Sequence, residues 1–198
     1  MPTTSAILLR KFPLTDTSLI VHWCSAEHGL IKTAAKGARR PGSPMAGSLD
    51  LFYEVEMEYV PAKRGDLHTL KELAVTNYRH GLQASYLRVL GAAYFVRLIE
   101  MVAERETPIV ELHDLLSRGL NWLCAHEPTL KAVQHFEKEV AKLLGLWSAT
   151  RAQTPEAALR EIYHQLPEQR RQLWDRLSNA AGSVRSDSED RPEAADPA

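Results

Sequence analysis

The sequence predicts an α+β protein in which a small β-barrel precedes an all-α domain. Residues 5–75 contain five short apolar and β-branched runs, parted by turn-forming clusters. From about Gly81 onward, apolar residues recur with the 3.6-residue period of a helix. The hydrophobic share of 44% is ordinary for a packed globular chain. We therefore expect a β domain at residues 1–80, a helical domain at residues 81–182 and a disordered acidic tail at residues 183–198.

The clearest strand is Tyr53–Tyr59, with the sequence YEVEMEY. Its apolar residues alternate with three glutamates, which predicts one buried face and one wet, acidic face. The other predicted strands are residues 5–12, 17–25, 30–36 and 67–75. Five short strands in roughly eighty residues are too few for a sandwich and suit a closed barrel of the OB type. A short helix is expected from Ser43 to about Leu49, because Ser43 can cap it and Pro44 fits its first turn.

The second domain is predicted to be a helical bundle. Its first helix is expected from Gly81 to about Arg105, and a second is expected to follow Thr107 as its cap. A third helix covers residues 127–147, Thr154 opens a fourth, and residues 167–180 form a fifth. Its basic residues are interpreted as solvated faces: Arg105, Arg118, Lys131, Lys138, Lys142, Arg170 and Arg171.

The net charge of −1 conceals an uneven distribution along the chain. Six basic residues face two acidic ones up to Arg40, whereas two basic residues face five acidic ones from Ser183 onward. The first residues lack the pattern of a secretory signal, and no run of eighteen apolar residues occurs. Cys24 and Cys124 are too few for a disulfide framework. We expect a reduced, cytoplasmic protein.

No pattern of a known catalytic or nucleotide-binding site occurs in the sequence, so we do not expect an enzyme. Glu54, Glu56 and Glu58 fall on one face of a strand and could hold a metal, but acids on the wet face of a strand usually serve solubility. Two further groups, His22 with Cys24 and His28, and Cys124 with His126, do not complete four ligands at a known spacing. We therefore expect no metal and no cofactor.

A basic segment, HGLIKTAAKGARRPGSPMAG at residues 28–47, is the strongest candidate for a binding site. Two interpretations compete, a solvated loop and a surface that binds phosphates. In an OB barrel, the second and third strands and two loops form the usual nucleic-acid groove. That argument adds basic residues outside the segment, and the candidate DNA-binding residues are Lys32, Lys36, Arg39, Arg40, Lys63, Arg64 and Arg10. Aromatic residues that could stack on bases are Phe12, Trp23, Phe52 and Tyr53, although each also fits a barrel core.

Residues 5–60 resemble the N-terminal domain of the bacterial RecO family of recombination mediators. The resemblance lies in a first strand at Ala6–Leu9, a second at Thr17–Val21, a turn at Ala26–Gly29, the AKGARR sequence at Ala35–Arg40 and the segment Ser43–Leu49. It weakens in the helices, where EKEVAKLLGL is the main likeness, and ends near Trp147. Many members carry a four-cysteine zinc module after this point, and this chain has no cysteine there.

The resemblance implies an OB-fold domain followed by a helical bundle, with no zinc and no cofactor turnover. It implies binding of single- and double-stranded DNA, annealing of complementary strands and help in loading RecA onto strands coated by the single-stranded-DNA-binding protein SSB. The implied partners are RecR and the acidic, apolar C-terminal tail of SSB, in a nucleoid-associated protein. An alternative is an adaptor that binds RecR or the SSB tail and has little affinity for DNA.

Overall fold

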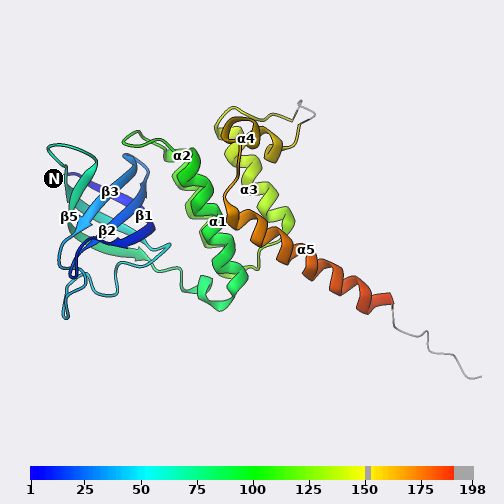
Figure 1. The fold of residues 1–198 in the computed structure, drawn as a ribbon, viewed down its shortest axis with the longest axis horizontal. Coiled ribbons are helices and arrows are strands. Elements are labelled where there is room, and N and C mark those ends of the chain that lie inside the picture. The colour runs from blue at the N-terminus through cyan, green and yellow to red at the C-terminus, as the bar shows by residue number, and fades with distance from the viewer. Residues whose placement is uncertain (150–152, 190–198) are drawn as a thin grey trace, which may run out of the picture.

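The computed structural model describes residues 1–149 and 153–189 and begins with a closed five-stranded barrel (Figure 1). The strands are β1 (Thr3–Pro13), β2 (Leu19–Ser25), β3 (Gly29–Ala35), β4 (Glu54–Val60) and β5 (Leu67–Asn77). Their order around the barrel is β1-β2-β3-β5-β4, and the β3–β5 pair alone is parallel. All five predicted strands are confirmed, as is the OB-type architecture.

Alternation along the strands fills the barrel. Val55, Met57 and Tyr59 of β4 are buried and the glutamates between them are not, as the period of two predicted. Trp23 of β2 is completely buried, and its indole Nε1 donates to Thr33 Oγ1 at 2.8 Å. The partner hydroxyl makes it possible to bury the polar end of the indole in the core.

The segment between β3 and β4 differs from the prediction, because it contains no helix. Ser43 donates its backbone N–H to Arg40, Ala46 to Ser43 and Ser48 to Met45. These bonds each span three residues, so the segment is a succession of turns. Gly42 and Gly47 have φ angles of 72° and 78°, which a helix cannot include. Ser43 Oγ does accept from the N–H of Met45, but no helix follows it.

The helical domain contains the short helix η1 (His80–Ala84) and then α1 (Tyr86–Val102), α2 (Val110–Ala125), α3 (Leu130–Leu143), α4 (Pro155–Tyr163) and α5 (Glu168–Glu189). The expected start of α4 at Thr154 is confirmed, because Thr154 accepts from a backbone N–H group of the first turn, and Thr129 caps α3 in the same way. Three starts were predicted wrongly: α1 begins after Ser85, α2 after Ile109 and α3 after Thr129. Of the predicted tail, residues 183–189 are the end of α5, and 190–198 lie outside the described residues.

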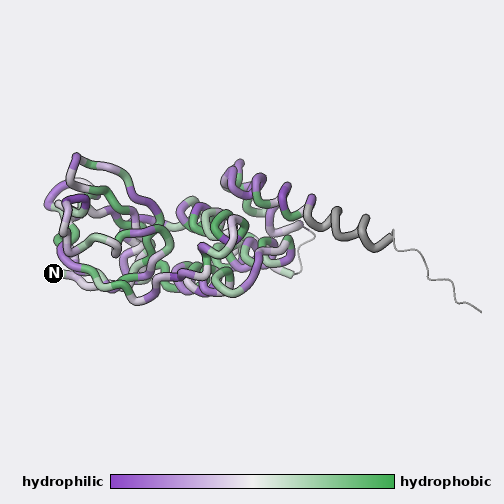
Figure 2. The backbone as a smooth tube through the Cα atoms, turned by 90° about the horizontal axis from the view of Figure 1, so that it is seen from below, coloured by the Kyte–Doolittle hydropathy of each residue, from purple (hydrophilic) through white to green (hydrophobic). Residues whose placement is uncertain are grey.

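The barrel and the helices share a hydrophobic core. One core cluster fills the barrel, and a second contains Ile7, Leu9 and Cys24 from its outer wall together with α1, α2, α3, α4 and α5. Figure 2 shows hydrophobic segments in both parts of the chain. We infer that the two domains pack as one unit. No described helix is long and apolar enough to cross a membrane.

Two contacts between backbones fix the angle at which the parts meet. The N–H of Leu30 donates to Glu104 O at 3.1 Å, and that of Ile109 donates to Ala26 O at 2.9 Å. Gly29 makes this approach possible: its φ is 66°, and a Cβ there would lie 2.3 Å from Thr107 O. A glycine is therefore required at the turn between β2 and β3.

Each half of the molecule contains a buried arginine, Arg79 or Arg170, whose burial was not predicted from the sequence. Arg79, 4% exposed, joins the barrel to α2 through Phe52 O, the Glu54 carboxylate, Ser117 and Asn121. Arg170, predicted to be solvated, is 8% exposed and donates to Glu137 at 2.6 Å and Glu156 at 2.8 Å. Tyr94 donates its hydroxyl to the same Glu137 at 2.5 Å, so that carboxylate has two donors. The prediction that Arg170 is solvated is therefore wrong, because the buried carboxylate of Glu137 inside the helical bundle needs a charged donor.

Candidate nucleic-acid interface

The loop after β3, residues 36–40, exposes three of the predicted cations. Lys36, Arg39 and Arg40 are exposed. Gly37, with a φ of 71°, turns the chain, and Arg39 is attached to the β1–β2 loop: its N–H donates to Thr17 O at 3.0 Å and its Nη1 to Thr15 O at 3.2 Å. We call Lys36, Arg39 and Arg40 the loop cations. Within the described residues, none lies within 4.0 Å of a carboxylate, so their charges are uncompensated by close partners.

Lys63 and Arg64 are also exposed, in the turn between β4 and β5. Because β5 runs parallel to β3 and pairs Leu67 with Lys32, this turn lies toward the beginning of β3. The loop cations follow the end of β3, so the two groups occupy opposite ends of the barrel, as the chain in Figure 1 shows. The structure therefore does not gather the candidate residues into one patch.

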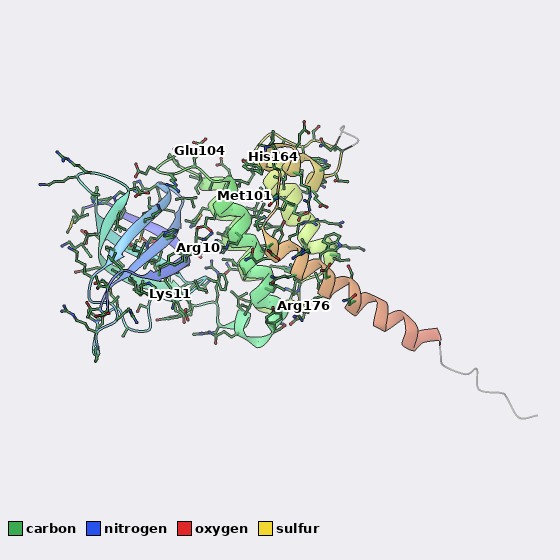
Figure 3. All side chains as sticks on the ribbon, viewed as in Figure 1. Arg10, Lys11, Met101, Glu104, His164 and Arg176 are labelled. Carbon is green, nitrogen blue, oxygen red and sulfur yellow. The ribbon has the colours of Figure 1, made fainter. Side chains whose placement is uncertain are left out.

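Arg10 and Lys32 lie on the barrel wall that faces α1. Arg10 pairs with His22 in the β1–β2 register, and His22 pairs with Lys32 in the β2–β3 register. We call these three residues the wall row. Figure 3 shows Arg10 on the side of the barrel toward Met101 of α1. The row lines a crevice of about 490 Å³ together with Asp66, Glu100, Met101 and Arg105.

Carboxylates neutralise the wall row. Glu100 Oε2 lies 2.5 Å from Arg10 Nη2 and 3.2 Å from Arg97 Nη1, and its Oε1 lies 3.6 Å from His22 Nδ1. Burial lowers the pKa of His22 against the opposing effect of Glu100, which favours a neutral imidazole at pH 7. Asp66 pairs with Lys32 at 2.7 Å, and this hydrogen bond lowers the pKa of Asp66.

Of the aromatic candidates, Phe12 alone is exposed, at 42%, whereas Trp23, Phe52 and Tyr53 are buried. Phe12 lies near the end of β1, where Pro13 pairs with Leu19 and Leu19 pairs with Ala35, the last residue before the loop cations. The ring of Phe12 therefore lies at the same end of the barrel as the loop cations. That combination of an aromatic face and cations is typical of surfaces that bind single-stranded nucleic acid.

A second recess, which sequence reasoning missed, lies between α2 and α3. It encloses about 480 Å³, with an apolar lining from Phe95, Leu115, Gly119, Trp122 and Phe136. Its remaining lining includes three basic side chains, Arg118, Lys131 and His135. Gly119 keeps it open, because a Cβ there would lie 3.0 Å from the ring of Phe136. No group of three or more His, Cys, Asp or Glu side chains that could hold a metal occurs within the described residues.

The architecture defines the class of the molecule as an OB-barrel protein with an appended helical domain and exposed basic loops. Residues 1–79 match the family model described as Recombination protein O N terminal. The chain belongs to the RecO family. The resemblance of its first strands, turn and basic loop to that family is thereby confirmed.

Curated relatives show the same likeness. The DNA repair protein RecO of Cyanothece sp. is 31% identical over 156 residues, 78% of this chain and 52% of that protein. The RecO of Rhodopirellula baltica is 29% identical over 145 residues, 73% of this chain and 54% of that protein. The RecO of Pelobacter propionicus is 27% identical over 154 residues, 76% of this chain and 62% of that protein. The chain thus spans about half the length of the curated relatives it matches.

Proposed function

We propose that the chain acts in recombinational DNA repair as a non-catalytic mediator that binds and anneals single-stranded DNA. The observation that supports this proposal most is the set of loop cations, which are exposed and have no close carboxylate among the described residues. The names of the relatives, each a DNA repair protein RecO, agree with it. With RecR, the protein would assist the loading of RecA onto SSB-coated strands.

The physical basis is the release of counterions from DNA. Each phosphate of a single strand that is neutralised by a lysine or arginine contributes about −0.7 to the slope of log affinity against log salt. The three loop cations would therefore contribute about −2. If one further lysine or arginine also neutralises a phosphate, the slope is about −3, and the affinity for DNA falls roughly fifty-fold between 50 and 200 mM salt. Such binding carries little sequence preference, as a mediator of strand pairing requires.

The test is a fluorescence-anisotropy titration of a labelled oligonucleotide, repeated at four salt concentrations. We expect saturable binding at 50 mM salt, a slope near −3 and faster annealing of complementary strands in the presence of the protein. An absence of binding at 50 mM salt would contradict the proposal.

A second function, as an adaptor for the C-terminal tail of SSB, is favoured by the recess between α2 and α3. An acidic, apolar tail requires an apolar pocket beside cations, and this recess combines Trp122 and Phe136 with Arg118 and Lys131. Neutralisation of the wall row also favours weak DNA binding. RecR would then be the second partner of the adaptor.

Capture of purified SSB, with and without its last residues, distinguishes the two functions when combined with the DNA titration. The adaptor alone predicts tail-dependent capture with no DNA binding at physiological salt. Lys131→Glu should abolish capture and leave the salt slope of DNA binding unchanged. Lys142→Glu serves as the control, because Lys142 lies at the other end of α3 and does not line the recess. Undiminished capture by Lys131→Glu would remove the recess from the proposal.

A further inference from the structure

The crevice between the barrel and α1 lies where an OB barrel binds its ligand, yet carboxylates already occupy it. The wall row crosses β1, β2 and β3, and with strands about 4.8 Å apart it spans roughly 10 Å. Asp66 is at the end of the β4–β5 turn, which also carries Lys63 and Arg64. The face of the second and third strands and that turn form the usual ligand groove of an OB barrel.

Each of two carboxylates bridges a barrel cation to a cation from the helical domain. Glu100 joins Arg10 to Arg97, and Asp66 joins Lys32 to Arg105 at 2.7 and 3.4 Å. The crevice lining holds three cations, Arg10, Lys32 and Arg105, and a third carboxylate, Glu106, beside Glu100 and Asp66, so its charges balance while both pairs form. A carboxylate that bridges two cations occupies the position that a phosphate oxygen would take on the same donors.

Stability does not account for the pair at Asp66. The side chains of Asp66 and Arg105 are 49% and 68% exposed, and exposed ion pairs contribute little to folding. The pair instead changes the charge of the crevice, because Asp66 neutralises Lys32. Because the barrel and the helices share a core, we expect displacement of either carboxylate to proceed by side-chain rotation, with the two domains still packed.

From this arrangement we propose that Glu100 and Asp66 compete with DNA phosphates for the wall row. While these two carboxylates occupy the crevice, single-stranded DNA contacts the loop cations alone. DNA enters the crevice only after the carboxylates are displaced from the wall row. This inference rests on the proposed DNA-binding function and adds an autoinhibitory contact to it. Removing the two negative charges, with the side chains kept, should extend the DNA-binding surface from the loop cations into the crevice.

The variants that test this are Glu100→Gln, Asp66→Asn and the double variant, each titrated with labelled single-stranded DNA from 50 to 200 mM salt. The control is Glu139→Gln, which removes the same charge from a pair with Lys142 on α3, away from the barrel. We expect each charge removal in the crevice to tighten binding about threefold at 50 mM salt, from the repulsion removed at about 6 Å in water. The slope of the double variant should steepen by about 1.4, which corresponds to two new phosphate contacts.

A second step shows whether the gain passes through the wall row. Lys32→Ala should weaken the double variant about threefold and leave the wild type nearly unchanged, since Lys32 is engaged with Asp66 there. Because the side chain of Asp66 is half exposed, we expect Asp66→Asn to fold even if Glu100→Gln does not. Crevice variants that bind no tighter than Glu139→Gln would overturn the inference and leave DNA binding by the loop cations intact. If no variant and no wild-type protein binds at 50 mM salt, both proposals fail.

Discussion

Replacing Arg79 by methionine should destabilise the whole molecule, because this side chain joins the two domains from a buried position. Its guanidinium donates to Phe52 O at 2.6 Å, to Ser117 Oγ and Asn121 Oδ1 at 2.9 Å each, and to the Glu54 carboxylate. Methionine preserves much of the side-chain length but leaves Glu54, 17% exposed, without its charged partner. Removing one partner of a buried ion pair costs about 3 kcal/mol or more.

For a chain of this size, about 3 kcal/mol corresponds to a fall in Tm of roughly 6–12 °C. The assay is thermal unfolding followed by circular dichroism, with urea unfolding as a second measure. Arg118→Met is the matched control, since its partner Asp114 is 60% exposed and the pair should change stability by less than about 0.5 kcal/mol. Adding Glu54→Gln to Arg79→Met should restore part of the loss, because the unpaired charge is gone. A Tm for Arg79→Met within about 2 °C of that of the control would refute the reasoning.

Three further predictions concern stability and reactivity. Gly29→Ala should lower the free energy of unfolding by about 2 kcal/mol or more, since its Cβ would lie 2.3 Å from Thr107 O. Gly65→Ala, where φ is also positive but no atom lies within 4 Å, should lower it by about 1 kcal/mol. Equal melting temperatures of the two variants would contradict this prediction. Burial raises the pKa of the Cys24 thiol to about 12, so a thiol reagent at pH 8 should modify Cys24 only after unfolding, and rapid modification of the native protein would show the residue to be accessible. A hydrogen bond from Thr4 lowers the pKa of Glu27, so its stabilisation is present above the unfolded pKa of about 4.3 and is lost as pH falls through the lower folded pKa. The Tm difference between wild type and Thr4→Val should therefore narrow from pH 7 to pH 3, and an unchanged difference would exclude Glu27 as its source.

The fold could be predicted largely from the sequence because its elements are determined locally. Apolar residues and glutamates alternate so regularly in Tyr53–Tyr59 that the pattern predicts a half-buried strand. Thr154 followed by Pro155 is sufficient to predict the start of a helix. Ser43 and Pro44 give the same local signal, but the glycines at positions 42 and 47 have positive φ angles, and turns form there instead. The local signal for a helix start is thus insufficient by itself, because a nearby glycine such as Gly47 also permits the positive φ of a turn.

The site could be predicted only in part because its electrostatics arise between distant segments. The loop cations are neighbours in sequence, so their exposure together could be expected. Glu100 lies ninety residues from Arg10, and no pattern in either segment indicates that they pair. Arg170 likewise resembles a surface residue in its own helix, and its pairing with Glu137 and Glu156 makes its burial possible.

The claim on which this account depends most is that the loop cations bind DNA phosphates. The direct measurement is the salt slope of single-stranded DNA binding for a variant with Lys36, Arg39 and Arg40 replaced by alanine. A control with Lys142, Arg160 and Arg171 replaced by alanine removes the same charge from exposed ion pairs of the helical domain. The account predicts that the first variant flattens the slope by about two units and that the control leaves it unchanged. An unchanged slope in the first variant, or equal flattening in both, would contradict it.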